Sequence, residues 1–460
     1  MNKYDIVVIG GGPSGMVTAM TAKKQHCEKS VLMITEAPKG VVPCGIPYVF
    51  HELESIDKNV MGPKPFVNMG GELLIGQVDQ VDTAQRIVST QSGEKIGYDK
   101  LVFATGSRPS VPTFIKGHDF ANGIGYVPKS YEGIRYLKEQ TDAAKKIIIL
   151  GSGFTAIEMA EQLAQEPGKQ VHLVYRAEHC LHRSLSPDLA AKVDAALEEA
   201  GVVLHHRSQI AEITGTNDTA TGIRLDDGQT LDADLIIAAM GYQPNSEIAT
   251  TAGLRVNEHD AIVVDNYLRT SAEDVFAVGD CAQTISFITG RPAQIMLAST
   301  ATAEARILGY NLYSMNIRRN FPGALSVFST ELAGHVFSSA GVIEPKARAA
   351  GIDVVIGQFN DVDRHPGTLP DVSPIGVRLV VSPADGQIIG GELFGGKSIG
   401  EMINTIALAI QKNVTVYELI SFQLGTHPLL TTAPTKPILI KAAEHAIAQI
   451  EGKRPSRPPC

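Results

Sequence analysis

The chain contains five cysteines, and Cys44 is the one whose position suggests chemistry. It follows Pro43 at the start of a predicted helix, where the helix dipole would stabilise a thiolate, the form that attacks disulfides. A single thiol there would react through a mixed disulfide, a persulfide or a sulfenic acid. We expect Cys27, Cys180 and Cys281 to be inert buried thiols. Because no C-x-x-C pair of the kind that binds zinc occurs, no metal site is expected.

A glycine run follows the first apolar strand and fits the phosphates of a dinucleotide. Gly10 would turn out of the strand, Gly12 would let main-chain N–H groups approach a pyrophosphate, and Gly15 would allow close helix packing. The next strand delivers Glu36 about 20 or more residues after the glycines, where such folds bind a ribose hydroxyl. Strand, turn, helix and acid agree, so these residues predict a dinucleotide site.

A second glycine turn follows a strand predicted at 146–150. Gly151 and Gly153 form this turn, Ala156 allows the following helix to pack closely, and a further strand is predicted at 171–175. The sequence therefore predicts two dinucleotide folds in one chain.

Three other features lie at predicted strand ends. Small residues would let the main chain approach a cofactor at 104–106 (Ala-Thr-Gly) in the first fold and at Gly241 in the second. Farther along, Gly279 precedes Asp280, whose carboxylate could accept hydrogen bonds from a polyol. A simple strand-end turn is the alternative for this last pair.

The hydrophobic pattern around these motifs predicts an α/β protein with a further α+β domain. The strand at 6–9 is a continuous apolar run that suits a parallel strand covered on both faces, and a second strand is predicted at 30–35. After about Gly323 the pattern changes to short alternating strands at 354–359, 376–381 and 388–394, with helices near 398–411 and 435–450. The segment 452–460, which ends in Cys460, is rich in Pro and charge and is predicted to be a flexible tail.

Composition excludes several classes of protein. The net charge of -9 offers no general attraction to nucleic acid or to an anionic membrane. The apolar runs are far shorter than the roughly 20 residues that span a bilayer. The N-terminal segment lacks the regions of a signal peptide, so we expect a cytoplasmic protein.

In the order of its motifs the chain resembles the pyridine nucleotide-disulfide reductase family of flavoproteins. The segment 270–280 matches the family's T-x5-(Tyr or Phe)-A-x-G-D stretch at the FAD ribityl chain, and the resemblance spans almost the whole chain. It implies FAD and NAD(P)H as cofactors and a homodimer whose interface domain starts near 328–333. The implied domains are an FAD-binding domain at 1–112 and 246–322, an NAD(P)-binding domain at 113–245, a dimerisation domain at 323–451 and a flexible tail at 452–460.

The resemblance assigns the second glycine turn to the nicotinamide cofactor. It implies that Phe154 is an aromatic gate over the flavin, with an ordinary core position as the alternative, and that Glu158 opens the helix. Where an NAD enzyme presents an acid, this chain has Tyr175 and Arg176, with Arg183 shortly after. Arginine accommodates a 2′-phosphate, so NADPH is favoured, while an acid close by, at 178, leaves NADH open.

Members of the family that the chain resembles differ in the number of cysteines in the segment around Cys44. Glutathione and lipoamide reductases carry C-x4-C in this segment, whereas the single Cys44 resembles CoA-disulfide reductases, polysulfide reductases, NADH oxidases and NADH peroxidases. His427 resembles the His-Pro segment that glutathione-type enzymes insert into the partner's active site, where a histidine could exchange protons with a thiol. The family's orienting Glu falls at Thr432, so a loop histidine without a catalytic role stays open.

The leading hypothesis is an FAD-dependent NAD(P)H oxidoreductase that reduces a small disulfide, persulfide or polysulfide through Cys44, with His427 as the second catalytic residue. The alternatives are an NADH oxidase or peroxidase that uses a cysteine sulfenic acid, and a flavoprotein that carries electrons to a protein partner. The predicted FAD-site residues are Gly10, Gly12, Pro13, Ser14, Gly15, Glu36, Ala37, Val78, Ala104, Thr105, Gly106, Gly279, Asp280, Leu297 and Ala298. The predicted NAD(P)-site residues are Gly151, Gly153, Phe154, Thr155, Ala156, Glu158, Tyr175, Arg176, Arg183 and Gly241.

Overall fold

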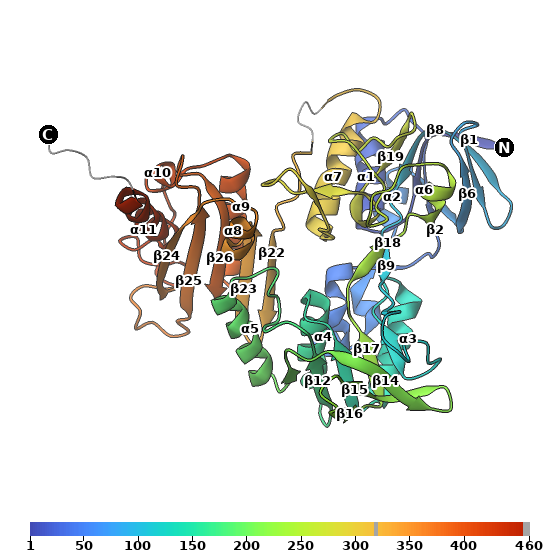
Figure 1. Ribbon diagram of the computed structural model, residues 1–460. Helices are drawn as coiled ribbons and strands as arrows, with labels where there is room; N and C mark the ends of the chain where they lie inside the picture. The colour runs from blue at the N-terminus through green and yellow to red at the C-terminus, as the bar shows by residue number, and fades with distance from the viewer. Residues whose placement is uncertain (317–320, 454–460) are drawn as a thin grey trace. The chain divides into compact units, whose positions relative to one another are not determined.

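A computed structural model describes residues 1–316 and 321–453 (Figure 1). The chain divides into two compact units. Unit 1 comprises Met1–Gly151, Glu166–Val171 and Ile210–Ala324, and unit 2 comprises Ser152–Gln165, His172–Gln209 and the chain from Leu325 onward. Cys460, at the end of the predicted flexible tail, lies outside the described residues.

The main sheet of unit 1 brings three predicted cofactor turns to one edge. β1 (Asn2–Ile9) pairs in parallel with β2 (Val31–Thr35) and β8 (Lys95–Phe103), and β8 pairs in parallel with β19 (Val275–Ala277). In this register the ends of β1, β8 and β19 lie side by side. Ligands of such sheets bind outside the carboxyl ends of the strands. The turns after Ile9, Phe103 and Ala277 therefore lie at one edge of the sheet.

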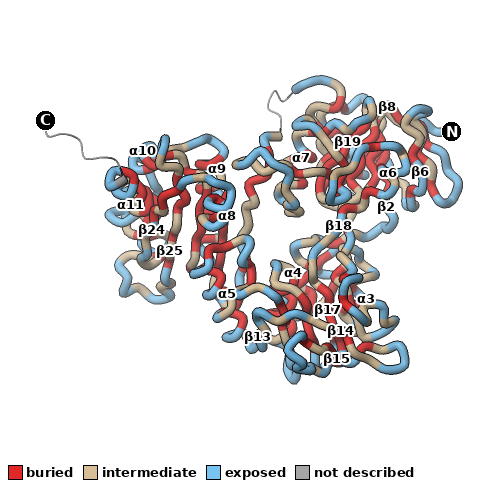
Figure 2. The backbone as a smooth tube through the Cα atoms, in the orientation of Figure 1, coloured by how far each residue is buried: buried red, intermediate tan, exposed pale blue. Residues whose placement is uncertain are grey.

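Both faces of this sheet are covered, as the apolar pattern of its first strand predicted. Ile6 and Val8 belong to a buried cluster on one face, and Val7 and Ile9 to a cluster on the other. Helices α1 (Pro13–Gln25) and α7 (Ala298–Asn311) pack against each other. Figure 2 shows the strands of this sheet as a largely buried layer.

Shorter elements complete the first dinucleotide fold. The sheet is extended by β5 (Glu72–Ile75), β6 (Val78–Asp82) and β7 (Ile87–Thr90). The remaining elements are β3 (Gly40–Val41), η1 (Pro43–Gly45), η2 (Pro47–Phe50), η3 (Ile56–Asn59), β4 (Val60–Met61), α2 (Lys64–Asn68), α6 (Glu247–Thr251), η4 (Gly279–Cys281), β20 (Thr284–Ile285) and β21 (Pro292–Ala293).

The second dinucleotide fold is divided between the units. In unit 1, β17 (Leu235–Ala238) pairs in parallel with β10 (Ile124–Tyr126) and β11 (Lys146–Leu150). Unit 1 also holds β9 (Ser107–Pro109), α3 (Tyr131–Ala143), β14 (Ile210–Thr216), β15 (Thr219–Leu225), β16 (Thr230–Asp232) and β18 (Tyr242–Pro244). The strand β12 (Gln170–Val174) begins in unit 1 and continues in unit 2, where it pairs in parallel with β13 (Val203–His205). Helices α4 (Phe154–Ala164) and α5 (Pro187–Glu199) lie in unit 2.

Unit 2 also contains a five-stranded antiparallel sheet in the order β22-β23-β26-β25-β24. Its strands are β22 (Phe328–Leu332), β23 (His335–Gly341), β24 (Val355–Val362), β25 (Pro374–Val381) and β26 (Ile388–Gly395), and its helices are α8 (Glu344–Ala349), α9 (Ile399–Gln411), α10 (Val416–Leu419) and α11 (Ile438–Lys453). This α+β arrangement agrees with the predicted change of pattern near Gly323, and the predicted ends of its elements shift by a few residues.

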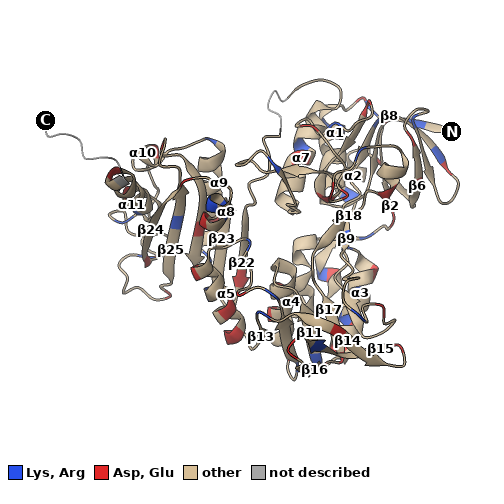
Figure 3. Ribbon diagram, in the orientation of Figure 1, with Lys and Arg blue, Asp and Glu red and all other residues tan. Residues whose placement is uncertain are grey.

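Figure 3 shows Lys and Arg interspersed with Asp and Glu along the described chain. Among the residues that the structure describes, none of the helices is long and apolar enough to cross a membrane. In the same ranges, no group of three or more His, Cys, Asp and Glu side chains is arranged to hold a metal ion.

Candidate functional site

The first glycine turn forms a cradle at the start of α1. Gly10 has φ +112°, and a Cβ at this position would lie 2.1 Å from the carbonyl oxygen of Ala104. A Cβ at Gly15 would lie 2.0 Å from the carbonyl oxygen of Gly10. Gly12 differs, because its backbone is extended and nothing lies within 4 Å of a Cβ placed there. Close packing at two glycines and open space at the third fit a pyrophosphate held by the N–H groups of the helix N-terminus.

Glu36 and Ala37 follow β2 and are exposed, so the Glu36 carboxylate is accessible to a ribose hydroxyl. Val78 is buried in the core beneath the sheet, which leaves only its main chain for a cofactor contact. Leu297 and Ala298 are half-buried at the start of α7. Their assignments to the FAD site remain predictions.

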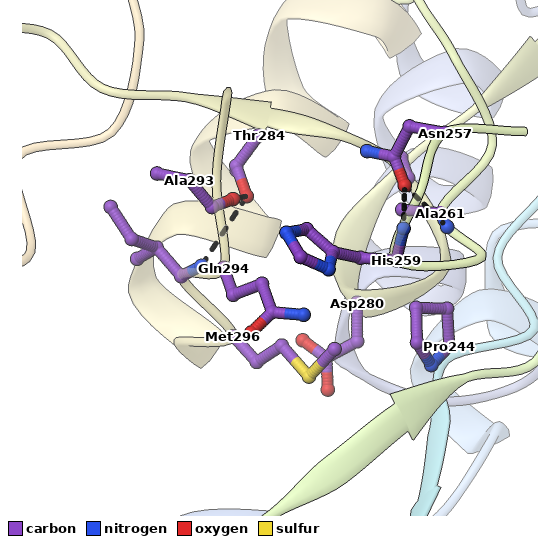
Figure 4. Close-up of a pocket in the computed structure, with 11 residues that line it drawn as sticks. Pro244, Asn257, His259, Ala261, Asp280, Thr284, Ala293, Gln294 and Met296 are labelled. Atoms are coloured by element: carbon purple, nitrogen blue, oxygen red, sulfur yellow. Dashed lines mark hydrogen bonds between the residues drawn. The ribbon is translucent and has the colours of Figure 1, made fainter. Parts of the chain in front are cut away.

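Asp280 belongs to a hydrogen-bonded cluster that the sequence did not reveal. Its Oδ2 atom accepts from Ser107 Oγ at 2.7 Å and from Lys129 Nζ at 2.6 Å. The Lys129 ammonium also lies 4.2 Å from the ring centroid of Tyr242. Asp280 borders a small hollow, partly open to solvent, that is also lined by His259 and Met296 (Figure 4). Two hydrogen bonds therefore fix the Asp280 carboxylate at the edge of this hollow. This position fits an acceptor for the hydroxyl groups of a polyol.

Glu304 of α7 is a second feature that motif spacing missed. Its side chain is buried, and Oε2 accepts a hydrogen bond from the Gly279 N–H at 2.8 Å. Gly279 has φ +75°, and a Cβ there would lie 2.6 Å from Ser14 Oγ. Burial raises the pKa of Glu304 to about 8, with the Gly279 N–H opposing the shift and the Asp280 charge adding to it. Near neutral pH, Glu304 is therefore largely a neutral acid among three predicted FAD-site residues.

Glu304→Gln is expected to stabilise the FAD-containing protein at alkaline pH. Because the folded-state pKa is raised, the folded protein binds more protons than the unfolded chain above the ordinary glutamate pKa, and stability falls as pH rises toward about 8. Glutamine does not ionise, so this loss of stability disappears, and its amide oxygen can still accept the hydrogen bond from the Gly279 N–H. Thermal unfolding should show a melting temperature higher by about 3 °C or more at pH 8.5, and little change at pH 5. The exposed Glu273→Gln should change neither; equal melting temperatures at pH 8.5 would contradict the neutral-acid assignment.

Cys44 is exposed on a short braced turn. The Val42 N–H donates to the carbonyl oxygen of Asn59 at 3.0 Å, and Asn59 Nδ2 donates back to the Val42 carbonyl oxygen at 3.0 Å. A Cβ at Gly45 would lie 2.1 Å from Asn59 Oδ1, so this glycine allows the close approach. The expected helix is absent from the segment: two 3₁₀ turns begin at Pro43 and Pro47, because proline interrupts regular helical hydrogen bonding. The dipole of a long helix therefore does not act on Cys44.

The other described cysteines correct one expectation. Cys180 and Cys281 are buried, as expected, whereas Cys27 is exposed just after the end of α1. Its backbone carbonyl accepts a hydrogen bond from Lys23 Nζ at 3.2 Å. Cys27 is therefore a natural control for Cys44.

The second glycine turn repeats the geometry of the first. Gly151 has φ +133°, and Gly241, the small residue that follows β17, has φ +107°. Gly153 is extended, with nothing within 4 Å of a Cβ placed there. Phe154 and Thr155 begin α4, and Ala156 is fully buried. Within unit 2, the open Gly153 and the N-terminus of α4 fit a helix start that holds a pyrophosphate.

The loop after β12 exposes two arginines. Tyr175 is buried, and burial raises the pKa of its hydroxyl beside Cys180, so its ring points into the core. Arg176 and Arg183 are exposed. The nearby Glu178 forms an ion pair with Arg207. This pair partly neutralises the acid at 178, which was the reason to keep NADH as an alternative cofactor.

Helix α4 carries Phe154 and Glu158 on one face. The Phe154 ring packs edge-on against Phe328 of β22, with centroids 4.4 Å apart. Glu158 lies in the second turn of α4 and does not open it as expected, since the helix starts at Phe154. Glu158 Oε1 accepts from Thr330 Oγ1 at 2.8 Å, and burial raises the pKa of Glu158 to about 7.

His427 lies in the exposed segment between α10 and α11. Its Nδ1 accepts from the Leu429 N–H at 3.2 Å, so the neutral ring carries its proton on Nε2. Exposed apolar side chains surround it in sequence, among them Phe422, Leu424 and Leu430. Such a segment fits an interface with a second chain.

Two family descriptions match successive parts of the chain. The family description "Pyridine nucleotide-disulphide oxidoreductase" matches residues 4–305, and its dimerisation domain matches residues 332–438. An NADH oxidase from Methanocaldococcus jannaschii is 28% identical over 97% of this chain and 99% of its own length. An NAD(P)H coenzyme A polysulfide/persulfide reductase from Pyrococcus horikoshii is 31% identical over 93% and 95%. The solved structure of an NAD-dependent persulfide reductase from A. fulgidus is 27% identical, has a TM-score of 0.89 and covers 97% of this chain and 84% of its own.

Proposed function

The chain belongs to the pyridine nucleotide-disulphide oxidoreductase family, and on that premise we propose that it reduces a small disulfide, persulfide or polysulfide through Cys44. It is an oxidoreductase with two dinucleotide-binding folds, and its cofactors are FAD and NAD(P)H. The dimerisation-domain match supports a homodimer. The substrate class and the role of Cys44 are the proposal.

The observation that carries the proposal is the exposed Cys44 on its braced turn. This thiol is accessible to a substrate, and it lies in the same compact unit as the turns proposed for FAD. The relatives named as sulfur reductases support the same substrate class. Cys180 and Cys281 are buried, so neither offers an equally accessible thiol.

The proposed reaction balances as one disulfide reduced per NAD(P)H. The Cys44 thiolate attacks one sulfur of the substrate, a new S–S bond forms to Cys44, and the other sulfur leaves as a thiolate. Bound FAD supplies the path for the two electrons that come from the hydride of NAD(P)H. When these electrons break the mixed disulfide, the second thiolate leaves and Cys44 is regenerated. The two product thiols need two protons. One comes from the hydride, which equals a proton and two electrons, and the other comes from solvent.

His427 is proposed to donate a hydrogen bond from Nε2–H to the leaving thiolate, which takes its proton from solvent. Its Nε2 carries the proton in the neutral ring, and the exposed segment would present it to the partner chain. The structure gives its Nδ1 a main-chain donor, which can hold the ring without the glutamate that Thr432 replaces.

A second candidate is an NADH oxidase, because a relative of that name covers almost the entire chain. Cys44 would then cycle through a sulfenic acid, with oxygen or peroxide as the acceptor. Reduced enzyme can be prepared anaerobically with NADPH or NADH and mixed with CoA disulfide, polysulfide, peroxide or oxygen while the flavin spectrum is followed. Rapid reoxidation by a sulfur compound supports the proposal, and reoxidation by oxygen or peroxide alone favours the second candidate.

The exposed arginines lead to an expected preference for NADPH. Arg183→Ala and Arg176→Ala should each raise KM for NADPH about tenfold or more, since a charge-assisted hydrogen bond to a phosphate is lost, and should leave KM for NADH within about twofold. Steady-state kinetics with both nucleotides measure this. Arg224→Ala on β15 controls for net charge. Equal effects on both nucleotides would exclude a 2′-phosphate contact.

A further inference from the structure

Two side chains of α4 meet two side chains of β22. Phe154 and Glu158 are four residues apart on the helix and share one of its faces, and Phe328 and Thr330 are two residues apart on the strand and share one of its faces. The pairs form two rungs: the rings of Phe154 and Phe328 at 4.4 Å, and Thr330 Oγ1 donating to Glu158 Oε1 at 2.8 Å. All four residues belong to unit 2.

The second rung joins a buried hydroxyl to a half-buried carboxyl. Thr330 is 4% exposed, and its hydroxyl donates the hydrogen bond that engages this carboxyl. On the packed elements α4, α5 and β22, Glu161 of α4 is the charged group whose field acts on Glu158, and its negative charge opposes ionisation. The Thr330 hydroxyl therefore decides which oxygen of Glu158 is engaged and which, Oε2, is left for another partner.

We propose that Thr330 is a positioning residue for Glu158, which presents its second carboxylate oxygen to the nicotinamide carboxamide, and that Phe328 holds Phe154 in the same way. This inference rests on the proposed function and on the assignment of the second glycine turn, which leads into α4, to the nicotinamide cofactor; that assignment places nicotinamide beside α4. It makes hydride transfer depend on the first strand of the C-terminal sheet in the same chain. The contribution of β22 is one of orientation, since neither of its residues takes part in the reaction.

The direction of the expected change follows from the donor. Thr330 lowers the pKa of Glu158, while burial and Glu161 raise it, with about 7 as the result. Thr330→Val removes the donor, so the pKa rises and Glu158 is protonated over a wider range of pH. Thr330→Ser keeps the donor. A step that needs the Glu158 carboxylate should therefore shift toward alkaline pH in Thr330→Val alone.

The experiment compares the FAD-containing wild type with Thr330→Val, Thr330→Ser, Glu158→Gln and the double variant Thr330→Val/Glu158→Gln. The rate of flavin reduction by NADPH is measured by anaerobic rapid mixing between about pH 5.5 and pH 9, without a sulfur acceptor. Infrared titration of the carboxyl C=O stretch, with Glu158→Gln as the reference, reports ionisation of Glu158 independently of turnover. Ser329→Ala, on the opposite face of β22, is the matched control.

We expect Thr330→Val to slow reduction about fivefold or more at pH 7 and to move the pH profile and the infrared titration up by about one unit. Thr330→Ser and Ser329→Ala should behave like the wild type, and Thr330→Val should add nothing to Glu158→Gln. A Thr330→Val profile that matches the wild type, or an equal slowing in the Glu158→Gln background, overturns the inference while the nicotinamide placement stands. If Glu158→Gln itself leaves reduction unchanged, that placement and this inference both fail.

Discussion

Cys44→Ser is expected to lower turnover with a small disulfide or persulfide by a factor of at least about 10³, while reduction of FAD by NAD(P)H stays within about twofold. A serine hydroxyl is neither ionised at neutral pH nor able to form the mixed disulfide that the reaction requires. The hydride step does not involve the thiol, so it should persist. Anaerobic flavin reduction and acceptor-dependent reoxidation, measured on the same preparation, separate the two steps. A long-wavelength absorption from the thiolate to oxidised flavin should be present in wild type whose Cys44 is reduced and whose flavin is oxidised, and absent in the variant.

Cys27→Ser is the matched control, because Cys27 is the other exposed cysteine in the described part of the chain. It should keep full turnover. If Cys44→Ser retains activity with the natural acceptor, the thiol is structural, and the flavoprotein passes electrons to a protein partner. If both sulfur and peroxide reactions disappear, trapping of a sulfenic acid with dimedone in the wild type distinguishes the oxidase or peroxidase hypothesis from the sulfur reductase.

The parts of the site that follow from local sequence were predictable. Gly10 and Gly151 follow continuous apolar strands, and both adopt positive φ as a turn out of a parallel strand requires. The small-residue turn at 104–106 and the Asp280 motif were identified independently, and parallel pairing of the strands before them brings them to one edge of the sheet. The order of elements along the chain was sufficient to predict where these turns lie, because ligands of such sheets bind at that edge.

The partners of these residues could not be predicted, because they come from distant segments. Lys129 reaches Asp280 across 151 positions, and Thr330 reaches Glu158 across 172. Neither lysine nor threonine stands in a motif of its own, so spacing gives no signal for them. Pairing of this kind is set by tertiary packing. The helix expected at Cys44 failed for a local reason, since Pro43 and Pro47 favour short turns.

Substitution of Gly12 or Gly153 by alanine is the second change with a large expected effect. Each substitution is expected to weaken binding of a different cofactor. Gly12 and Gly153 both have extended backbones that alanine adopts freely, and a Cβ at either position meets nothing within 4 Å. The folded protein without cofactors should therefore tolerate either substitution. If the open space serves a pyrophosphate, the added methyl group takes the place of a phosphate oxygen at the helix N-terminus. Gly12→Ala should weaken FAD binding about 100-fold or more, which corresponds to roughly 3 kcal/mol.

Gly153→Ala should show the converse behaviour: full FAD content, a normal melting temperature, and flavin reduction by NADPH that no longer saturates at concentrations sufficient for the wild type. FAD occupancy of the purified variants and anaerobic reduction rates measure the two effects. Gly62→Ala, another position with nothing within 4 Å of a Cβ, should change neither quantity. Because the local geometries of Gly12 and Gly153 match, loss of a different cofactor in each variant would reflect the fold that holds the glycine. Loss of folding in both would instead mean that their open space is structural, and the assignment of the two turns would fail.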